Sequence, residues 1–404
     1  MGDQPAVATI TTWDEAKDAY RQRSFRQALY DEGEVVMADV LVNLHGDEHR
    51  QRRRLENRLF RREVFLEFQE HRFPPVVERT LAPYLEQGRA ELVDLGHELM
   101  MNLAAVVAGV DRPRQTAEES FRLYGFLMSF IEGATLAHHT GDKQAKAAEV
   151  REALDRFDEE FLAGSIARRQ DLIAQAERGD LDPEQLPRDV LTVLLQNEEN
   201  LHLPHEVVRR EIAFFLLAGA HTSATAFVRT LHHIFAWVDE HDEDRERLLA
   251  DRTFVQRCVH ETIRLWPSSP VAQRWALEPV TLRSTGREIE QGTKVVIDLM
   301  QINRSTEVFG PNAEHFDPYR EIPDGAAPWG QSFGGGMHVC IGQDLASGVL
   351  PGNRVEETHL TGLVPVAVQA MLDHGARPDP EDPPSMDTTT ARPYWGRYPV
   401  LLGT

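Results

Sequence analysis

The sequence predicts a mainly α-helical protein with a small β region, an α+β fold formed by one large domain. Two observations lead to this fold class. Helical hydrophobic spacing fills most of the first half of the chain, and from Pro270 onward proline, glycine and β-branched residues become more frequent. No Gly/Ser linker, repeat or low-complexity tract divides the 404 residues. We therefore expect a single domain over residues 1–404.

Helical spacing with few breakers predicts helices over residues 13–29, 47–70, 75–85, 92–110, 115–132, 142–176 and 187–195. A longer apolar helix is expected from about Pro204 to Val238, with a length of roughly 50 Å, enough to cross the whole domain. Short alternating runs at 280–282, 293–299 and 398–402 predict small strands.

Composition excludes several classes of function. The 65 acidic and 43 basic residues give a formal net charge of −22, a field that repels nucleic acid and anionic lipid. With only Cys258 and Cys340 there is no disulfide framework. The longest strongly apolar run, 212–220, is about half of what a bilayer crossing needs, and the N-terminus shows no signal region. We expect a cytoplasmic protein that binds neither nucleic acid nor membrane.

The segment 333–346, which reads FGGGMHVCIGQDLA, places Cys340 between two glycine turns. Glycines 334–336 can adopt positive φ and leave room for a flat ligand, and Gly342 lets the chain pass close to it. Residues 341–346 are expected to begin a helix whose amide end lowers the pKa of the thiol. A buried structural cysteine is the alternative. A phosphate-binding loop is excluded because no Gly-Lys-Ser/Thr follows.

At these residues the chain resembles the cytochrome P450 family of haem-thiolate monooxygenases, in its soluble bacterial type. Five fixed positions of the motif F-G-x-G-x-H-x-C-x-G-x-x-L-A would match by chance at about 10⁻⁴ over this length. The resemblance implies haem b with Cys340 as axial thiolate ligand to the iron, which favours O–O cleavage. It also implies that Phe333, Gly334 and His338 contact the haem, which would lie between the long helix and the cysteine loop.

The middle of the long helix reads Ala218-Gly219-Ala220-His221-Thr222, three small residues followed by two polar ones. Small residues let a flat group approach the backbone, and Thr222 can donate to a carbonyl of its own helix. Tight packing between helices is the alternative. The resemblance implies an oxygen-binding notch at Ala218 and Gly219 in which Thr222 supports proton delivery. His221 replaces the family's acidic residue, and we expect it either to relay a proton or only to pack locally.

Two further sets of residues agree with the resemblance. Glu261 and Arg264 lie one turn apart on a predicted helix, and the family implies that they form a buried structural network with Arg320. A second set comprises His49, Arg53, Arg274 and His338, to which the family assigns the haem propionates. Each of these residues taken alone is more typical of a solvated surface.

Seven arginines lie between Arg50 and Arg62 in this acidic chain. They form either a solvated helix face or a basic surface where an acidic electron carrier docks. The resemblance implies electrons from NAD(P)H through a ferredoxin reductase and a ferredoxin. Histidine pairs at 138–139 and 232–233 lack the spacing of metal ligands.

The leading hypothesis is a monooxygenase that inserts one atom of dioxygen into a small, largely apolar organic substrate. The alternatives are a haem-thiolate enzyme that uses peroxide or performs coupling or rearrangement, and a haem-binding sensor or carrier without turnover. Segments 24–45 and 121–139 and the neighbourhood of Val271 are expected to line the substrate pocket. The family's N-terminal helix and outer strands are expected to be shortened or absent, which leaves open what covers the pocket.

Overall fold

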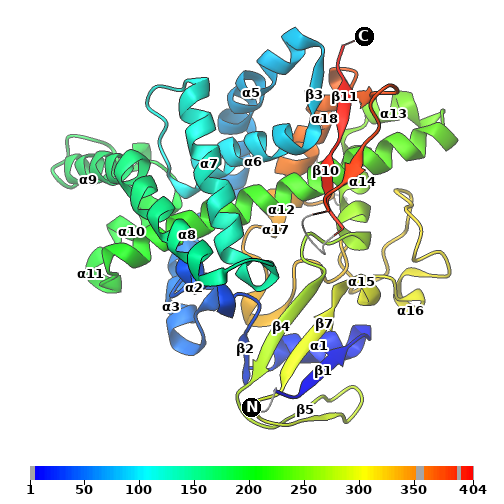
Figure 1. The fold of residues 1–404 in the computed structure, drawn as a ribbon, viewed down its shortest axis with the longest axis horizontal. Coiled ribbons are helices and arrows are strands. Elements are labelled where there is room, and N and C mark those ends of the chain that lie inside the picture. The colour runs from blue at the N-terminus through cyan, green and yellow to red at the C-terminus, as the bar shows by residue number, and fades with distance from the viewer. Residues whose placement is uncertain (1–4, 352–358, 389–392, 404) are drawn as a thin grey trace.

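The computed structural model describes residues 5–351, 359–388 and 393–403. Among the described helices, α12 (His205–Glu240) is the longest, and it passes through the middle of the molecule (Figure 1). By length and composition it alone of these helices could cross a membrane, yet 67% of the relevant stretch is buried inside the protein. That burial is the property of a core helix, which is apolar on nearly every side because other elements surround it.

The other helices form most of the molecule, as the sequence predicts. Before α12 they are α1 (Trp13–Arg21), α2 (Glu34–Met37), α3 (Gly46–Glu56), α4 (Arg62–Glu67), α5 (Phe73–Gln87), α6 (Leu92–Ala108), α7 (Ala117–Ala134), α8 (Lys143–Phe157), α9 (Ala163–Glu177), α10 (Val190–Gln196) and α11 (Glu198–Leu201). After it come α13 (Asp244–Ala250), α14 (Arg252–Leu265), α15 (Leu299–Ile302), α16 (Thr306–Phe309), α17 (Gln343–Ser347) and α18 (Leu363–Asp373).

Short strands form four small sheets. The largest has the order β1-β7-β4-β2, in which β1 (Val7–Ile10) runs parallel to β7 (Lys294–Asp298), and β4 (Val271–Ala276) is antiparallel to both β7 and β2 (Phe25–Gln27). A second sheet has the order β3-β11-β8, from Arg89–Glu91, Pro399–Leu401 and Arg377–Pro378. The pairs β5–β6 (Val280–Thr281, Glu288–Ile289) and β9–β10 (Ser385–Met386, Trp395–Arg397) complete them.

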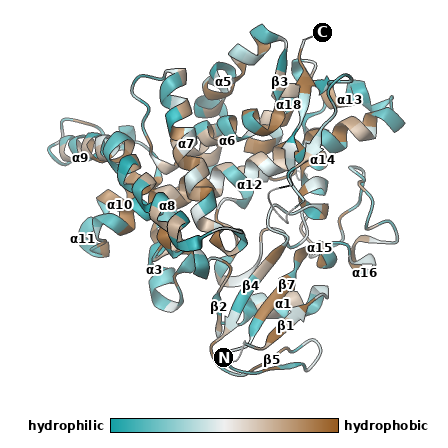
Figure 2. Cartoon of the chain, viewed as in Figure 1, coloured by the Kyte–Doolittle hydropathy of each residue, from teal (hydrophilic) through white to brown (hydrophobic). Residues whose placement is uncertain are grey.

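Two hydrophobic cores correspond to the helical body and the main sheet. The larger core surrounds α12 and includes α6, α7, α14 and α18. The smaller one joins α1 to the main sheet through residues such as Ile10, Ala16 and Val295. In Figure 2 the outlying helix α9 is mostly hydrophilic, in agreement with its burying only Ser165 and Arg169. The mainly α fold with a small β region is therefore confirmed.

Several element boundaries differ from the sequence prediction. The predicted helix 13–29 ends at Arg21, because residues 25–27 pair with β4 instead. The predicted helix 47–70 divides at residues 57–60, where successive backbone bonds reach back only three residues and tighten the chain into turns. The predicted helix 142–176 is continuous through a π-helical turn at Asp158–Leu162. Strands β1–β4, β6 and β8–β10 were not predicted, since such short runs carry little periodicity.

The chain leaves α17 and returns to α18 at almost the same point. Gly348 and Gly362 are in such close contact that a Cβ on Gly362 would lie 2.2 Å from the Gly348 nitrogen. Both residues have positive φ, 70° and 91° respectively, so glycine is needed at each. An antiparallel bridge between Val349 and Leu360 closes the base of the excursion.

Candidate active site

The cysteine loop is shaped by contacts with the N-terminal helix. The Cys340 amide donates to the Phe333 carbonyl at 2.9 Å, which closes the loop. Gly334 and Gly336 adopt positive φ as predicted, but a Cβ on Gly336 would lie only 1.9 Å from the carbonyl oxygen of Tyr20. Gly335 is extended, with φ −163°, and a Cβ on it would lie 3.1 Å from Cβ of Tyr20. The expectation that all three glycines adopt positive φ and make room for a ligand is therefore wrong at Gly335 and Gly336, where the space accommodates the end of α1.

Cys340 is accessible to solvent, yet enough protein surrounds it that burial raises the pKa of its thiol. A hydrogen bond from the backbone of Gly342 and the charge of Arg53 act in the opposite direction. The lowering predicted from the amides at the helix start is present in the hydrogen bond from Gly342, but burial has the larger effect, so the pKa of the thiol is raised overall. A thiolate here requires a bound cation, since a metal replaces the proton that burial would otherwise retain.

Five hydrogen-bond donors gather beside this loop, and we refer to Tyr20, His49, Arg53, Arg274 and His338 as the donor cluster. The rings of His49 and His338 are 4.3 Å apart. The guanidinium of Arg274 lies 5.7 Å from the centre of the Tyr20 ring. His338 is close enough to Arg274 and Arg53 that their charges affect its pKa. The structure therefore brings together all four residues to which the sequence assigned a carboxylate, and it adds Tyr20.

Three members of the donor cluster have buried polar atoms without a partner among the described residues. The Tyr20 hydroxyl, both ring nitrogens of His49 and Nε2 of His338 are buried without a hydrogen-bond partner there. Burial lowers the pKa of His49 to about 4 and that of His338 to about 3. Burial also lowers the pKa of Arg53 and Arg274.

The two arginines of the cluster bind uncharged acceptors only. Arg53 donates to the Val339 carbonyl at 2.8 Å, and Arg274 donates to the Gln27 side chain at 2.6 Å. Neither arginine pairs with a carboxylate of the described chain. Buried donors without acceptors cost free energy, so the donor cluster fits an anionic group with several acceptor oxygens.

The middle of α12 lines a pocket on one side and packs against α6 on the other. Thr222 Oγ1 donates to the Ala218 carbonyl at 2.7 Å, the bond that the sequence predicts. Ala218 and Thr222 line the pocket, whereas a Cβ on Gly219 would lie 3.0 Å from Cβ of Ala104 on α6. Close helix packing therefore accounts for the glycine at 219, and its assignment to the oxygen-binding notch stays a prediction.

His221 lines the pocket and also contacts a histidine that the sequence did not single out. Its Nδ1 is 3.3 Å from Nε2 of His97 on α6, and the two rings are stacked with centres 5.6 Å apart. Nothing in the sequence links these residues, which are 124 positions apart. His221 is thus held between the pocket and α6.

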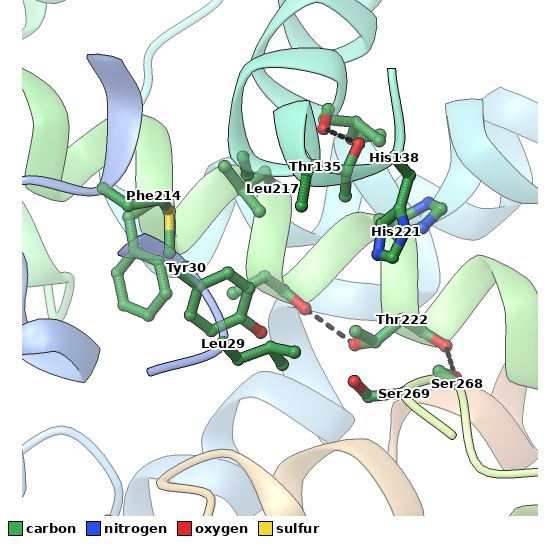
Figure 3. Close-up of a pocket in the computed structure, with 15 residues that line it drawn as sticks. Leu29, Tyr30, Thr135, His138, Phe214, Leu217, His221, Thr222, Ser268 and Ser269 are labelled. Atoms are coloured by element: carbon green, nitrogen blue, oxygen red, sulfur yellow. Dashed lines mark hydrogen bonds between the residues drawn. The ribbon is translucent and has the colours of Figure 1, made fainter. Parts of the chain in front are cut away.

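The pocket lies beside α12 and draws on each segment that the sequence predicted for substrate contact (Figure 3). Leu29, Tyr30 and Met37 come from 24–45; Ile131, Ala134, Thr135, Ala137 and His138 come from 121–139; Ser268 and Ser269 precede Val271; and α12 adds Phe214, Leu217, Ala218, His221 and Thr222. Most of the lining is apolar, with hydroxyl and imidazole groups toward one side.

Glu261, Arg264 and Arg320 form a buried network behind the cysteine loop. Arg264 binds both carboxylate oxygens of Glu261 at 2.6 and 2.7 Å, and Arg320 binds one of them at 2.9 Å. Arg264 also donates to the carbonyls of Asn303 and Ala313. Each charge is satisfied inside the protein, so these residues stabilise the surrounding loops.

The arginine-rich segment divides into buried and exposed members. Arg52 is buried and binds Glu211 at 2.8 Å, while Arg53 belongs to the donor cluster. Five others remain exposed, and we refer to them as the basic surface: Arg50, Arg54, Arg58, Arg61 and Arg62. Arg62 is close enough to Asp344, four residues after Cys340, to influence its pKa. The basic surface therefore borders the cysteine loop.

The accessible Cys340 can bind a metal ion, and the donor cluster beside it can bind an anionic group. Together they fit a cofactor that has both. The cytochrome P450 family model matches residues 148–349 of the chain. The chain is 26% identical over 291 residues to the putative cytochrome P450 137 of Mycobacterium tuberculosis, covering 68% of this chain and 58% of that protein. It is 25% identical over 352 residues to the cyclooctat-9-en-7-ol 5-monooxygenase of Streptomyces melanosporofaciens, covering 79% and 71% respectively.

A solved structure shows the same fold. The cytochrome P450 enzyme CYP109B1 from Bacillus subtilis superposes with a TM-score of 0.70 and 16% identity, over 99% of this chain and 96% of that one. The chain belongs to the cytochrome P450 family, whose members bind haem through a cysteine thiolate.

Proposed function

We propose that this protein is a haem-thiolate monooxygenase with a single catalytic domain over residues 1–404. In this proposal one atom of dioxygen is inserted into a small, largely apolar organic substrate. The donor cluster carries the proposal. Tyr20, His49 and His338 have buried polar atoms without a partner among the described residues, the two arginines pair with no carboxylate there, and the cluster lies next to the accessible Cys340. Haem b has two carboxylates, which fit the donor cluster, and a metal ion, which fits Cys340.

Each residue has a defined task in this proposal. Cys340 binds the iron, Phe333 and Gly334 shape the loop, and the donor cluster binds the two propionates with charge-assisted hydrogen bonds. When bound, the haem supplies the activation of dioxygen, and the axial thiolate favours cleavage of the O–O bond. Ala218 leaves space beside α12, and Thr222, whose hydroxyl donates to the Ala218 carbonyl, supports proton delivery at the pocket wall.

We further propose that electrons come from NAD(P)H through a ferredoxin reductase and a ferredoxin, in the cytoplasm. The basic surface supports an acidic partner of this kind, since opposite charge steers association. The basic surface also borders the cysteine loop, so a partner bound there would lie on the side from which Cys340 would hold the iron.

Haem content and ligation test this function directly. The purified protein is expected to contain one haem b, and its reduced carbon monoxide complex to show the red-shifted Soret band of thiolate ligation. Replacing Cys340 with His removes that band, while Cys258→Ser, at the other cysteine, retains it. A folded protein without haem, or an unshifted band in the wild type, would contradict the proposal.

The peroxide-driven alternative is favoured by one observation, the histidine pair at the position where the family has an acid. His221 contacts His97, so an imidazole stands where the family has a carboxylate. In a monooxygenase, His221→Asp keeps haem binding and changes the fraction of NAD(P)H consumed that yields product, and His221→Ala raises peroxide release. If turnover requires peroxide and is unaffected by the electron-transfer partners, the alternative function holds.

A further inference from the structure

A series of neighbouring rings runs along the C-terminal half of α12, between the edge of the pocket and the surface. Its five members, which we call the ring series, are Trp266, His233, Phe316, Trp237 and Tyr319. Successive ring centres lie 3.7, 5.4, 5.9 and 6.4 Å apart. No two neighbours are further apart than aromatic rings that pack directly on one another.

The two ends of the ring series lie in different surroundings. Trp266 is two residues before Ser268, which lines the pocket, and Tyr319 at the other end is 45% exposed. Between them, burial lowers the pKa of His233 to about 3, so this ring is uncharged. The ring series thus connects the neighbourhood of the pocket wall with solvent.

One carboxylate binds both of the outer rings. Asp244 of α13 is buried, and it accepts a hydrogen bond from Nε1 of Trp237 at 2.8 Å and another from the Tyr319 hydroxyl at 2.5 Å. The hydrogen bond to Asp244 raises the pKa of Tyr319, so the phenol keeps its proton. Arg247 donates to the Tyr319 oxygen at 3.0 Å, which leaves the hydroxyl hydrogen to Asp244.

This arrangement suits the loss of an electron. Tryptophan and tyrosine give up one electron more readily than phenylalanine or histidine, and tyrosine does so when a base within hydrogen-bond reach takes its proton. Asp244 is such a base for Tyr319, and its negative charge also favours a positively charged, oxidised Trp237. His233 and Phe316 only bridge the more easily oxidised rings.

We propose that Tyr319 is a second reaction site, at which a small hydrogen-atom donor such as ascorbate is oxidised at the expense of hydrogen peroxide. The ring series is the electron route from this site to the neighbourhood of the pocket. The inference rests on the proposed function, because it needs haem bound through Cys340.

Tyr319 loses one electron through the ring series and passes its phenolic proton to Asp244, whose carboxylate becomes a neutral acid. Ascorbate then gives Tyr319 a hydrogen atom, which re-forms the O–H bond, and Asp244 returns its proton to water. The O–O bond of hydrogen peroxide breaks as two electrons and two protons convert it into two water molecules, chemistry that haem supplies when bound. Each peroxide therefore consumes two hydrogen atoms from the reductant.

Tyr84 provides a matched control. Its hydroxyl also donates to a carboxylate, that of Glu98 at 2.7 Å, but its ring has no ring contact within the part of the chain that the structure describes. The two tyrosines therefore share the proton acceptor and differ in the electron route.

Spin trapping followed by peptide mapping tests the reaction site. Haem-loaded protein is mixed with hydrogen peroxide and the nitrone trap DMPO, and mass spectrometry identifies the labelled residues. We expect label at Tyr319, its loss in Tyr319→Phe, and a several-fold lower yield at Tyr319 in Trp237→Phe and in Asp244→Asn. Tyr84→Phe should leave the label at Tyr319 unchanged. Haem-loaded protein that consumes peroxide without label at Tyr319 would overturn the proposal.

A second oxidant separates an electron route from the mere exposure of Tyr319. Photogenerated tris(bipyridine)ruthenium(III) oxidises exposed tyrosines directly from solution, so the peroxide-dependent yield is expressed relative to this labelling. If that relative yield is the same in Trp237→Phe as in the wild type, the route through the ring series is overturned.

Consumption of ascorbate tests the activity itself. Its peroxide-dependent oxidation should fall several-fold in Tyr319→Phe and stay at the wild-type rate in Tyr84→Phe. Equal rates in all three proteins would overturn the assignment of Tyr319. A protein without the haem spectrum contradicts the proposed function instead, so the two failures are distinguishable.

Discussion

Helix α3 contributes to two buried polar clusters. One has an excess of hydrogen-bond donors, and the other has an excess of carboxyl groups. His49 and Arg53, one turn apart, belong to the donor cluster, which has donors but no carboxylate. Arg52 and Glu56, also one turn apart, meet Glu211 of α12 in what we term the acid cluster. There, Arg52 binds Glu211 at 2.8 Å, whereas both oxygens of Glu56 have no hydrogen-bond partner among the described residues and feel the arginines only through their charge.

The two clusters resolve their imbalance in different ways. A carboxylate can take up a proton, and burial together with the charge of Glu211 raises the pKa of Glu56 well above its usual value. Burial also raises the pKa of Glu211 to about 7. An arginine has no comparable option, because it stays charged in proteins. A buried excess of donors therefore indicates a missing ligand, whereas a buried excess of acids can be neutralised by a retained proton.

The largest expected difference between the two clusters is the effect of replacing Arg52 or its neighbour Arg53 with leucine. Arg52→Leu leaves two buried carboxylates without a cation, and we expect a loss of about 3–5 kcal/mol in the free energy of unfolding. Arg53→Leu should change the stability of the haem-free protein by about 1 kcal/mol or less, but weaken haem binding at least tenfold. Urea unfolding and haem titration measure the two effects. Indistinguishable variants would show that the clusters do not differ in role.

The acid cluster should give the protein a stability that declines as pH rises. The folded-state pKa of Glu211, about 7, exceeds its ordinary 4.5, so the folded protein retains a proton that the unfolded chain releases. The associated stability is complete below about pH 4.5 and lost as pH rises through about 7.

We expect the free energy of unfolding to fall by roughly 1–3 kcal/mol between pH 5 and 8.5. Glu56→Gln keeps the shape of the side chain without a charge, and it should reduce this decline. Urea denaturation at several pH values provides the measurement. A steeper decline in the variant would assign the retained proton to another group.

The basic surface should affect electron transfer and leave stability and haem binding unchanged. Reversing the charge at Arg50, Arg54 and Arg58 is expected to slow reduction by an acidic ferredoxin several-fold at low salt and to weaken its salt dependence. Haem content and the free energy of unfolding should stay unchanged, because exposed charges contribute little to stability. Stopped-flow reduction across salt concentrations measures the effect. Wild-type rates and salt slopes would identify the basic surface as a solvated face.

Sequence reasoning reached the fold class and most of the candidate site because local patterns carry them. The glycine and cysteine spacing around Cys340, the pair His49 and Arg53 one turn apart, and the long apolar helix are all visible in short segments. Whether these residues perform the assigned roles remains a prediction.

The remaining features depend on contacts between distant segments. His97 meets His221 only because α6 packs against α12, and the close packing of Gly219 has the same origin. Tyr20 enters the donor cluster because α1 ends against the cysteine loop. The pairing of Glu56 with Glu211 crosses two helices. No periodicity or motif marks such contacts, since they arise from tertiary packing.

The contact between Gly348 and Gly362 links the position of the cysteine loop to that of α18. Helix α17 begins at Gln343, three residues after Cys340, and ends at Ser347, directly before Gly348. A Cβ on Gly348 would lie 2.1 Å from the Thr361 carbonyl oxygen, and a Cβ on Gly362 would lie 2.2 Å from the Gly348 nitrogen. A side chain at either glycine would therefore force α17 and α18 apart and displace the segment that follows Cys340.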